Sequence, residues 1–317
     1  MPPTPTLEGK TVFVTGGSSG LGLEIAKIVA AQGAHVAIFS RRQKVLDAAK
    51  KEILAVRLHE NQEVSAIAVD LSNAKAVRAT FGSLKLVPDI LYCAAGGCQT
   101  ECGFLTEISS EDLDSCMRNN YYTAAYVSQV VLKIWRGVEN KPELRGRTKE
   151  RRIVFINSVG AFVGLPGYTA YTPSKAAVRG LADTLRMEAL YYSNPGTKYT
   201  IQCAFPSNIM TDAFIEEQKN KPQLTKEMEE TNKDLDELKK KLPSAAKVAQ
   251  YIVSRLNSDD FAICDSLASE LLWSNMIGPS PKRGLGVADS ILSFLVGTAI
   301  WPFQRRRWDK MCVQAGQ

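Results

Sequence analysis

A tyrosine and a lysine four residues apart, Tyr171 and Lys175, form the most informative pair in this 317-residue sequence. They open a segment with a helical pattern, so both side chains are expected on one helix face. A ketone that accepts a hydride also needs a proton, and a phenol with a pKa of about 10 is poorly matched to neutral pH. A nearby ammonium should lower that pKa, and Ser158, just past a predicted strand, can hold the carbonyl oxygen. The three residues predict ketone reduction with Tyr171 as the proton donor.

A glycine-rich segment near the N-terminus, residues 15–22, reads TGGSSGLG. It lies between a predicted strand and a predicted helix, which is the context that a nucleotide-binding turn requires. Glycines allow the backbone to approach a pyrophosphate, and the helix N-terminus stabilises its charge. The predicted cofactor contacts in this segment are Gly16, Ser18, Ser19, Gly20, Leu21 and Gly22.

The end of the second predicted strand indicates which dinucleotide binds. An NAD-specific enzyme usually has an acidic residue there for the ribose 2′-hydroxyl. This chain has Ser40, Arg41 and Arg42 instead, followed by Lys44. Guanidinium groups suit a 2′-phosphate, so the sequence predicts NADPH.

Apolar runs alternate with helical patterns along the first two thirds of the chain. Strands are expected at residues 10–15, 35–40, 64–69, 89–93, 153–157 and 199–205. Helices are expected at residues 21–32, 44–60, 74–84, 111–135 and 171–192. This alternation predicts an α/β fold with a doubly wound, mainly parallel Rossmann-type sheet. Residues 1–260 are expected to form the catalytic domain. Within it, residues 207–245 are either a mobile substrate lid, which their position favours, or an exposed helix with pairs such as Glu237 and Lys241.

Together these motifs resemble the short-chain dehydrogenase/reductase family from Lys10 to about Asp212. The resemblance implies that Asp70 and Leu71 contact the adenine, and that Asn120 completes a proton relay through water. Cys93-Ala94-Ala95-Gly96 stands where the family has Asn-Ala-Gly, so a side-chain amide is lost while the backbone geometry should survive. It further implies homo-oligomers and these cofactor contacts: Ala94, Ala95, Gly96, Tyr171, Lys175, Pro206, Ile209 and Thr211.

The C-terminal segment 261–317 is expected to associate with a membrane. Residues 285–303 are mostly apolar, near the lower length limit for a bilayer span, and a basic cluster with tryptophans nearby follows them. That cluster and a cytosolic catalytic domain both prefer the same side of a membrane. A shallow or re-entrant anchor, shared with Phe261–Ile277, removes this conflict. The alternative is a core or dimer helix.

With this tail, the whole chain resembles the 3-ketodihydrosphingosine reductase family. The resemblance rests on Asn157–Gly160, Gly167–Tyr171, Ser174-Lys175, Arg179–Ala182 and the basic apolar tail. It implies NADPH-dependent reduction of a long-chain ketosphingoid lipid in sphingolipid synthesis, on the cytosolic face of the endoplasmic reticulum. A membrane-bound steroid or fatty-acyl ketoreductase of the same superfamily shares the catalytic residues. A non-catalytic NADPH-binding scaffold has no need of them.

Composition sets further limits. A formal net charge of +6 is too mild to indicate a nucleic-acid partner. The seven scattered cysteines are expected to be reduced buried thiols, and C-x-x-x-C at Cys98 and Cys102 is weak evidence for zinc, so no metal is expected. The first ten residues lack the features of a secretory signal. A G-x-S-x-G hydrolase motif at Gly16–Gly20 is rejected, because both histidines, His35 and His59, follow it closely and none lies farther downstream.

Overall fold

The computed structural model describes residues 6–139, 149–274 and 296–300, with further single positions or pairs between 287 and 310. Its centre is one seven-stranded sheet in the order β3-β2-β1-β4-β5-β6-β7, and every neighbouring pair is parallel. The strands are β1 (Thr11–Thr15), β2 (His35–Ser40), β3 (Val64–Ala68), β4 (Ile90–Cys93), β5 (Lys149–Ile156), β6 (Thr197–Phe205) and β7 (Ala262–Cys264). The strand order reverses between β1 and β4, which is where doubly wound sheets bind ligands. The predicted parallel Rossmann-type sheet is confirmed.

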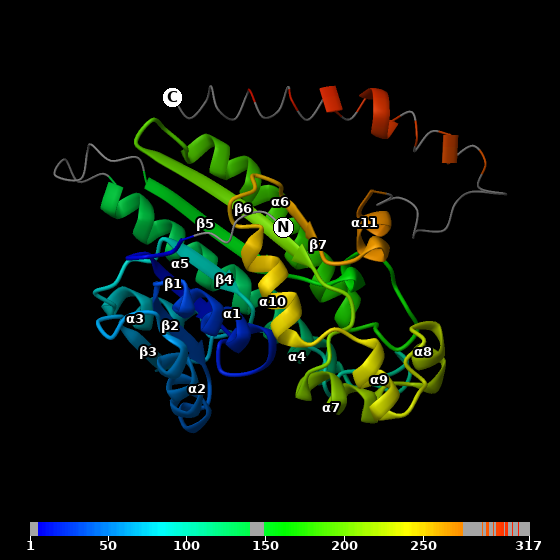
Figure 1. The fold of residues 1–317 in the computed structure, drawn as a ribbon. Helices are drawn as coiled ribbons and strands as arrows, with labels where there is room; N and C mark the ends of the chain where they lie inside the picture. The colour runs from blue at the N-terminus through cyan, green and yellow to red at the C-terminus, as the bar shows by residue number, and fades with distance from the viewer. Residues whose placement is uncertain are drawn as a thin grey trace.

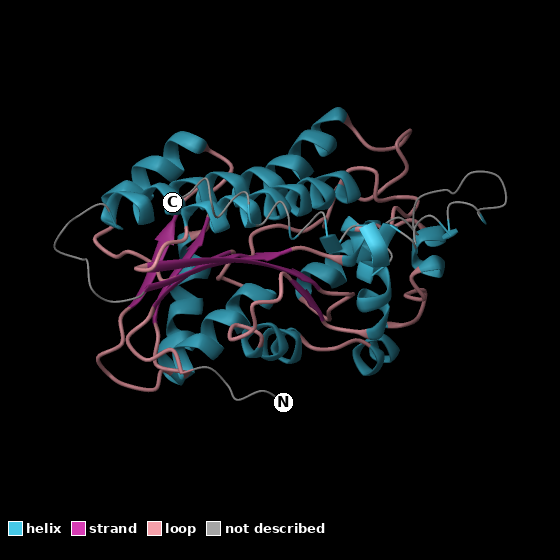
Figure 2. Ribbon diagram, turned by 90° about the horizontal axis from the view of Figure 1, so that it is seen from above, coloured by secondary structure: helices cyan, strands magenta, loops and turns pink. Residues whose placement is uncertain are grey.

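Helices cover both faces of the sheet (Figure 2). One face carries α1 (Gly20–Ala31), α2 (Gln43–Val56) and α10 (Ala245–Ser254). The other carries α3 (Ala74–Ser83), α5 (Thr123–Glu139) and α6 (Tyr171–Tyr192). Two separate apolar cores result, because successive strand residues point to opposite faces. Within β1, Phe13 joins one core while Val12 and Val14 join the other.

The last strand and the helix after it, α11 (Leu267–Ser274), correct the expected domain boundary after residue 260. β7 pairs with β6, so that boundary falls inside the sheet. Trp273 packs its ring 5.4 Å from Phe205 and 5.9 Å from Phe162. Residues 261–274 therefore pack into the catalytic unit, and their part in a shared membrane anchor stays a prediction. β7 has only three residues, which is too short for periodicity to reveal.

The helix expected at 111–135 is divided into three parts. α4 (Ser110–Met117) and α5 are joined by a π-helical turn, η1 (Arg118–Tyr122). π turns are frequent at functional sites, and this one contains Asn120. Ser109 begins α4 with a capping box, in which its hydroxyl accepts from the Asp112 backbone N–H.

The segment expected to be a lid or an exposed helix forms three short helices beside the carboxyl ends of the strands (Figure 1). They are α7 (Asp212–Asn220), α8 (Gln223–Met228) and α9 (Leu235–Lys241). Lys241 pairs with Glu230 at 2.8 Å and not with Glu237. Two further short turns are η3 (Val159–Ala161) and the π-helical η4 (Val296–Ile300).

Part of the predicted apolar tail, 285–303, lies outside the described residues. Among those that are described, no helix is long and apolar enough to cross a membrane.

Candidate active site

A cavity of about 600 Å³ opens at the carboxyl ends of the strands, between the body of the domain and α7. It brings together residues from β1 through to the lid. The predicted cofactor residues all line it except Lys44, and so do the predicted catalytic residues except Asn120. The sequence therefore identified the side chains that the fold gathers, although they are scattered from residue 16 to residue 211.

The glycine turn leaves no room for side chains. Gly16 has φ +68°, and a Cβ there would lie 2.8 Å from the Ala94 carbonyl oxygen. A Cβ on Gly22 would lie 2.4 Å from the Gly16 carbonyl oxygen. Ser19 begins α1 without a side-chain cap, and the first turn of α1 holds no acid, so its N–H groups are open to an anion. This cradle fits the pyrophosphate of a dinucleotide.

Thr15 explains how the site keeps its shape without the family's asparagine at residue 94. Its hydroxyl donates to the Tyr92 carbonyl oxygen at 3.2 Å. It also accepts from the backbone N–H groups of Ala94 and Ala95, at 3.0 and 3.3 Å. One side chain at the end of β1 thus fixes the backbone beyond β4.

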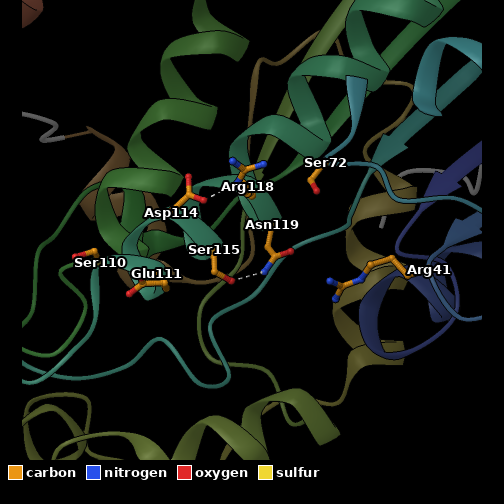
Figure 3. A pocket seen from close by; sticks show the side chains of 8 residues that line it. All are labelled: Arg41, Ser72, Ser110, Glu111, Asp114, Ser115, Arg118 and Asn119. Atoms are coloured by element: carbon orange, nitrogen blue, oxygen red, sulfur yellow. Dashed lines mark hydrogen bonds and ion pairs between the residues drawn. The ribbon is translucent and has the colours of Figure 1, made fainter. Parts of the chain in front are cut away.

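Arg41 and Arg42 line the cavity where β2 ends. Neither forms an ion pair with a described residue. In Figure 3, Arg41 extends across a neighbouring hollow of about 460 Å³ toward Asn119, whose amide donates to Ser115 at 3.1 Å. Two arginines without a described acidic partner fit a 2′-phosphate.

Ser158 and Tyr171 meet at the centre of the cavity. The Ser158 hydroxyl oxygen accepts from the Gly160 N–H at 3.1 Å, which leaves its own proton to donate. Asn157 orients the Ser158 backbone. The Asn157 amide donates to the Lys175 carbonyl oxygen at 3.1 Å, and the Asn157 side-chain oxygen accepts from the Ser158 N–H. Burial raises the pKa of Tyr171, and a hydrogen bond with Ser158 opposes that rise.

The net pKa of Tyr171 is raised in this structure because of burial, and the lowering effect expected of Lys175 stays a prediction. Lys175 Nζ lies 5.6 Å from the centre of the Tyr171 ring and donates to the Ile156 carbonyl oxygen at 3.4 Å. Burial lowers the pKa of Lys175 itself to about 8. Desolvation of the phenol is the largest influence on the pKa of Tyr171. At neutral pH the pair consists of a neutral phenol and a mostly charged lysine.

Asn120 lies behind the cavity wall. Its amide donates to the Gly97 and Cys116 carbonyl oxygens, both at 2.9 Å, and its oxygen accepts from the Gly97 N–H at 2.9 Å. These bonds hold the Gly96-Gly97 backbone against the π turn. A role in a proton relay stays a prediction.

Several lining residues were absent from the predicted site. Tyr168 sits within the GYTAY motif that sequence reasoning quoted, and Glu217 and Glu229 sit within the predicted lid. Their roles depend on which lid side chains turn inward, and a charged segment does not reveal that. Cys98 also lines the cavity, with its sulfur 3.2 Å from Cys102 Sγ, and the six described cysteines are buried free thiols.

Comparison with known proteins places this geometry in context. The family model for short chain dehydrogenases matches residues 10–222. A 3-ketodihydrosphingosine reductase from Aspergillus fumigatus is 32% identical over 91% of this chain and 80% of its own length. A PIGF/3-ketodihydrosphingosine reductase fusion protein from Schizosaccharomyces pombe is 32% identical over 96% of this chain, which spans only 57% of that longer protein.

A solved structure supports the fold. A short chain dehydrogenase/reductase from Burkholderia phymatum in complex with NAD superposes with a TM-score of 0.68 at 19% identity. The match covers 89% of this chain and 99% of that one.

Proposed function

The chain belongs to the short chain dehydrogenase family of oxidoreductases, and we propose that it reduces 3-ketodihydrosphingosine to dihydrosphingosine with NADPH. One observation carries this proposal: the similarity to a reductase with that substrate in its name extends over 91% of the chain, well past the shared nucleotide motifs. An intact set of Ser158, Tyr171 and Lys175 in one cavity argues for catalysis over a scaffold role.

The chain's own residues act on the ketone oxygen. Bound NADPH would supply the hydride to the carbonyl carbon. Ser158 holds the carbonyl oxygen through its free hydroxyl proton, and Tyr171 donates the proton that completes the alcohol. The raised pKa of Tyr171 keeps the phenol protonated before the reaction. The Lys175 ammonium provides positive charge near the phenolate that forms.

The preference for NADPH over NADH rests on Arg41 and Arg42. Both face the cavity, and the end of β2 offers no carboxylate for a ribose 2′-hydroxyl. Around the rest of the cofactor, the α1 N-terminus would hold the pyrophosphate, while Asp70 and Leu71 would border the adenine.

A membrane-associated tail, location at the endoplasmic reticulum with the catalytic domain in the cytosol, and a homo-oligomer belong to the same proposal. Four large apolar side chains described beyond residue 286 are exposed, among them Ile291 at 55% and Phe294 at 69%, which suits a membrane interface.

The deciding experiment measures NADPH oxidation by the full chain with 3-ketodihydrosphingosine, and with a steroid ketone in parallel. We expect turnover of the sphingoid ketone alone. Turnover of the steroid and not of the sphingoid ketone would replace the proposed substrate. Nucleotide binding without turnover of either would indicate a scaffold.

A further inference from the structure

A buried ionic cluster connects the lid to the catalytic cavity. Lys221, whose side chain is fully buried, contacts Glu217 at 2.8 Å and Glu229 at 2.5 Å. The Tyr168 hydroxyl lies 2.6 Å from Glu217 and 3.0 Å from Glu229, and donates its single proton to one of them. None of these four residues has a part in the chemistry described above.

The charges in this cluster do not balance. Two carboxylates face one ammonium, so the ionised cluster carries one surplus negative charge. A buried charge without a partner is costly, and burial raises the pKa of Glu217 despite Lys221 beside it. Both carboxylates keep a little exposure, 17% and 12%, and both line the cavity. The surplus charge therefore faces the space that a substrate enters.

The cluster lies close to the reacting position. The Tyr168 ring centre is 5.5 Å from that of Tyr171. The negative charge of Glu217 contributes to the raised pKa of Tyr171, so the two groups are within electrostatic reach. A cation bound by the carboxylates would therefore lie within electrostatic reach of the ketone oxygen that Tyr171 protonates.

Close packing holds the cluster in place. Thr225 of α8 donates to the Pro166 carbonyl oxygen at 2.5 Å. Gly167 has φ +88°, and a Cβ there would lie 2.6 Å from Thr225 Oγ1. Lys221 also lies over the rings of Tyr168 and Phe214. This part of the lid is fixed to the loop that precedes the catalytic helix, so the carboxylates are positioned before a ligand arrives.

We propose that Glu217 and Glu229 bind the ammonium group of an amino ketone and so select substrates that carry a protonated amine next to the carbonyl. The inference rests on the proposed function, because 3-ketodihydrosphingosine bears its amine on the carbon adjacent to the ketone. In this arrangement Tyr171 and Ser158 bind the ketone oxygen on one carbon, and the carboxylates bind the ammonium nitrogen on the adjacent carbon. Lys221 and Tyr168 act as positioning residues that orient the carboxylates.

The test compares two substrates in the full-length protein: 3-ketodihydrosphingosine and the same ketone without its amino group. Wild type should prefer the amino ketone. Glu229→Gln should lower kcat/KM for the amino ketone roughly tenfold or more, the scale of one charge-assisted contact, and change it little for the neutral ketone. Glu227→Gln is the matched control, because Glu227 is exposed in the same segment and its side chain bonds only to Gln223 among the described residues. Equal losses on both ketones would overturn the inference.

Binding separates this inference from the proposed function. The probes are short-chain dihydrosphingosine and its deaminated analogue, measured by calorimetry with NADPH affinity and thermal unfolding as folding checks. If Glu229→Gln binds dihydrosphingosine more weakly but binds the deaminated analogue as wild type does, the inference is supported. This holds even if wild type turns over no sphingoid ketone, a result that would defeat only the proposed function. Unchanged binding of the amine in Glu229→Gln would overturn the inference. The proposed function would still stand if wild type turned over the sphingoid ketone. If Glu229→Gln fails to fold, Glu217→Gln is measured in its place with the same criteria.

Discussion

The two halves of the cavity are built by different means. The proposed cofactor half is lined by backbone N–H groups, glycines and the exposed arginines at the end of β2. The proposed substrate half is lined by side chains on separate helices, among them two carboxylates held by a buried lysine. A turn between a strand and a helix is a local structure that a few residues specify. An ionic cluster between α7, α8 and the loop before α6 is not a local structure of this kind. The arrangement of the substrate half therefore depends more on tertiary structure than that of the cofactor half does.

Ending the chain after Asp260 should have the largest effect, because it removes β7 and Trp273 from the domain and exposes apolar surface of both cores. We expect loss of cooperative thermal unfolding and of NADPH binding. A chain that ends after Pro281 is the control and should keep both. It should also leave membranes in a liposome flotation assay. If the shorter chain folded and bound NADPH, β7 and α11 would not belong to the catalytic unit.

Tyr171→Phe should affect the substrate half alone. The ring and its contact with Tyr168 remain, and only the donated proton is lost. Turnover should fall on the order of 10²-fold or more, while NADPH affinity stays near that of wild type. Fluorescence titration and steady-state kinetics on one preparation measure both. If Tyr171→Phe kept most of the wild-type kcat, another group would be the proton donor.

Arg41→Ala is the reciprocal change in the cofactor half. It should weaken NADPH binding roughly tenfold or more, because it removes a charge-assisted contact with the 2′-phosphate, and leave NADH binding almost unchanged. Arg78→Ala, on the exposed face of α3, is the matched control. Equal weakening of both cofactors would show that Arg41 does not bind that phosphate.

The pH profile should show a milder effect that spans both halves. The pKa of Lys175 is lowered to about 8, so its ammonium is lost as the pH rises through that value. kcat/KM, which reports the free enzyme, should then fall at most tenfold per pH unit. The neutral ketone is the substrate to use, because its charge does not change with pH. If kcat/KM did not change between pH 7 and pH 10, Lys175 would not be the titrating group.

Almost every residue that the sequence predicted for cofactor binding lines the cavity. Residues 15–22 are contiguous, and their types dictate a tight turn at a helix N-terminus whatever surrounds it. Ser158, Tyr171 and Lys175 followed from a strand end and a helical spacing of four. Six of the seven strands were predicted within a few residues, since buried parallel strands have apolar runs.

Three features could be decided only by the tertiary structure. β7 exists because β6 offers it an edge, and three residues carry no period of their own. The Tyr171 pKa rises because the fold buries the phenol, whereas spacing showed only that a lysine was near. The carboxylates of the lid became a candidate ammonium site only when α7 and α8 turned them toward Lys221 and Tyr168. Local patterns determine turns and helix faces, but burial and contacts between distant segments depend on the whole packed chain.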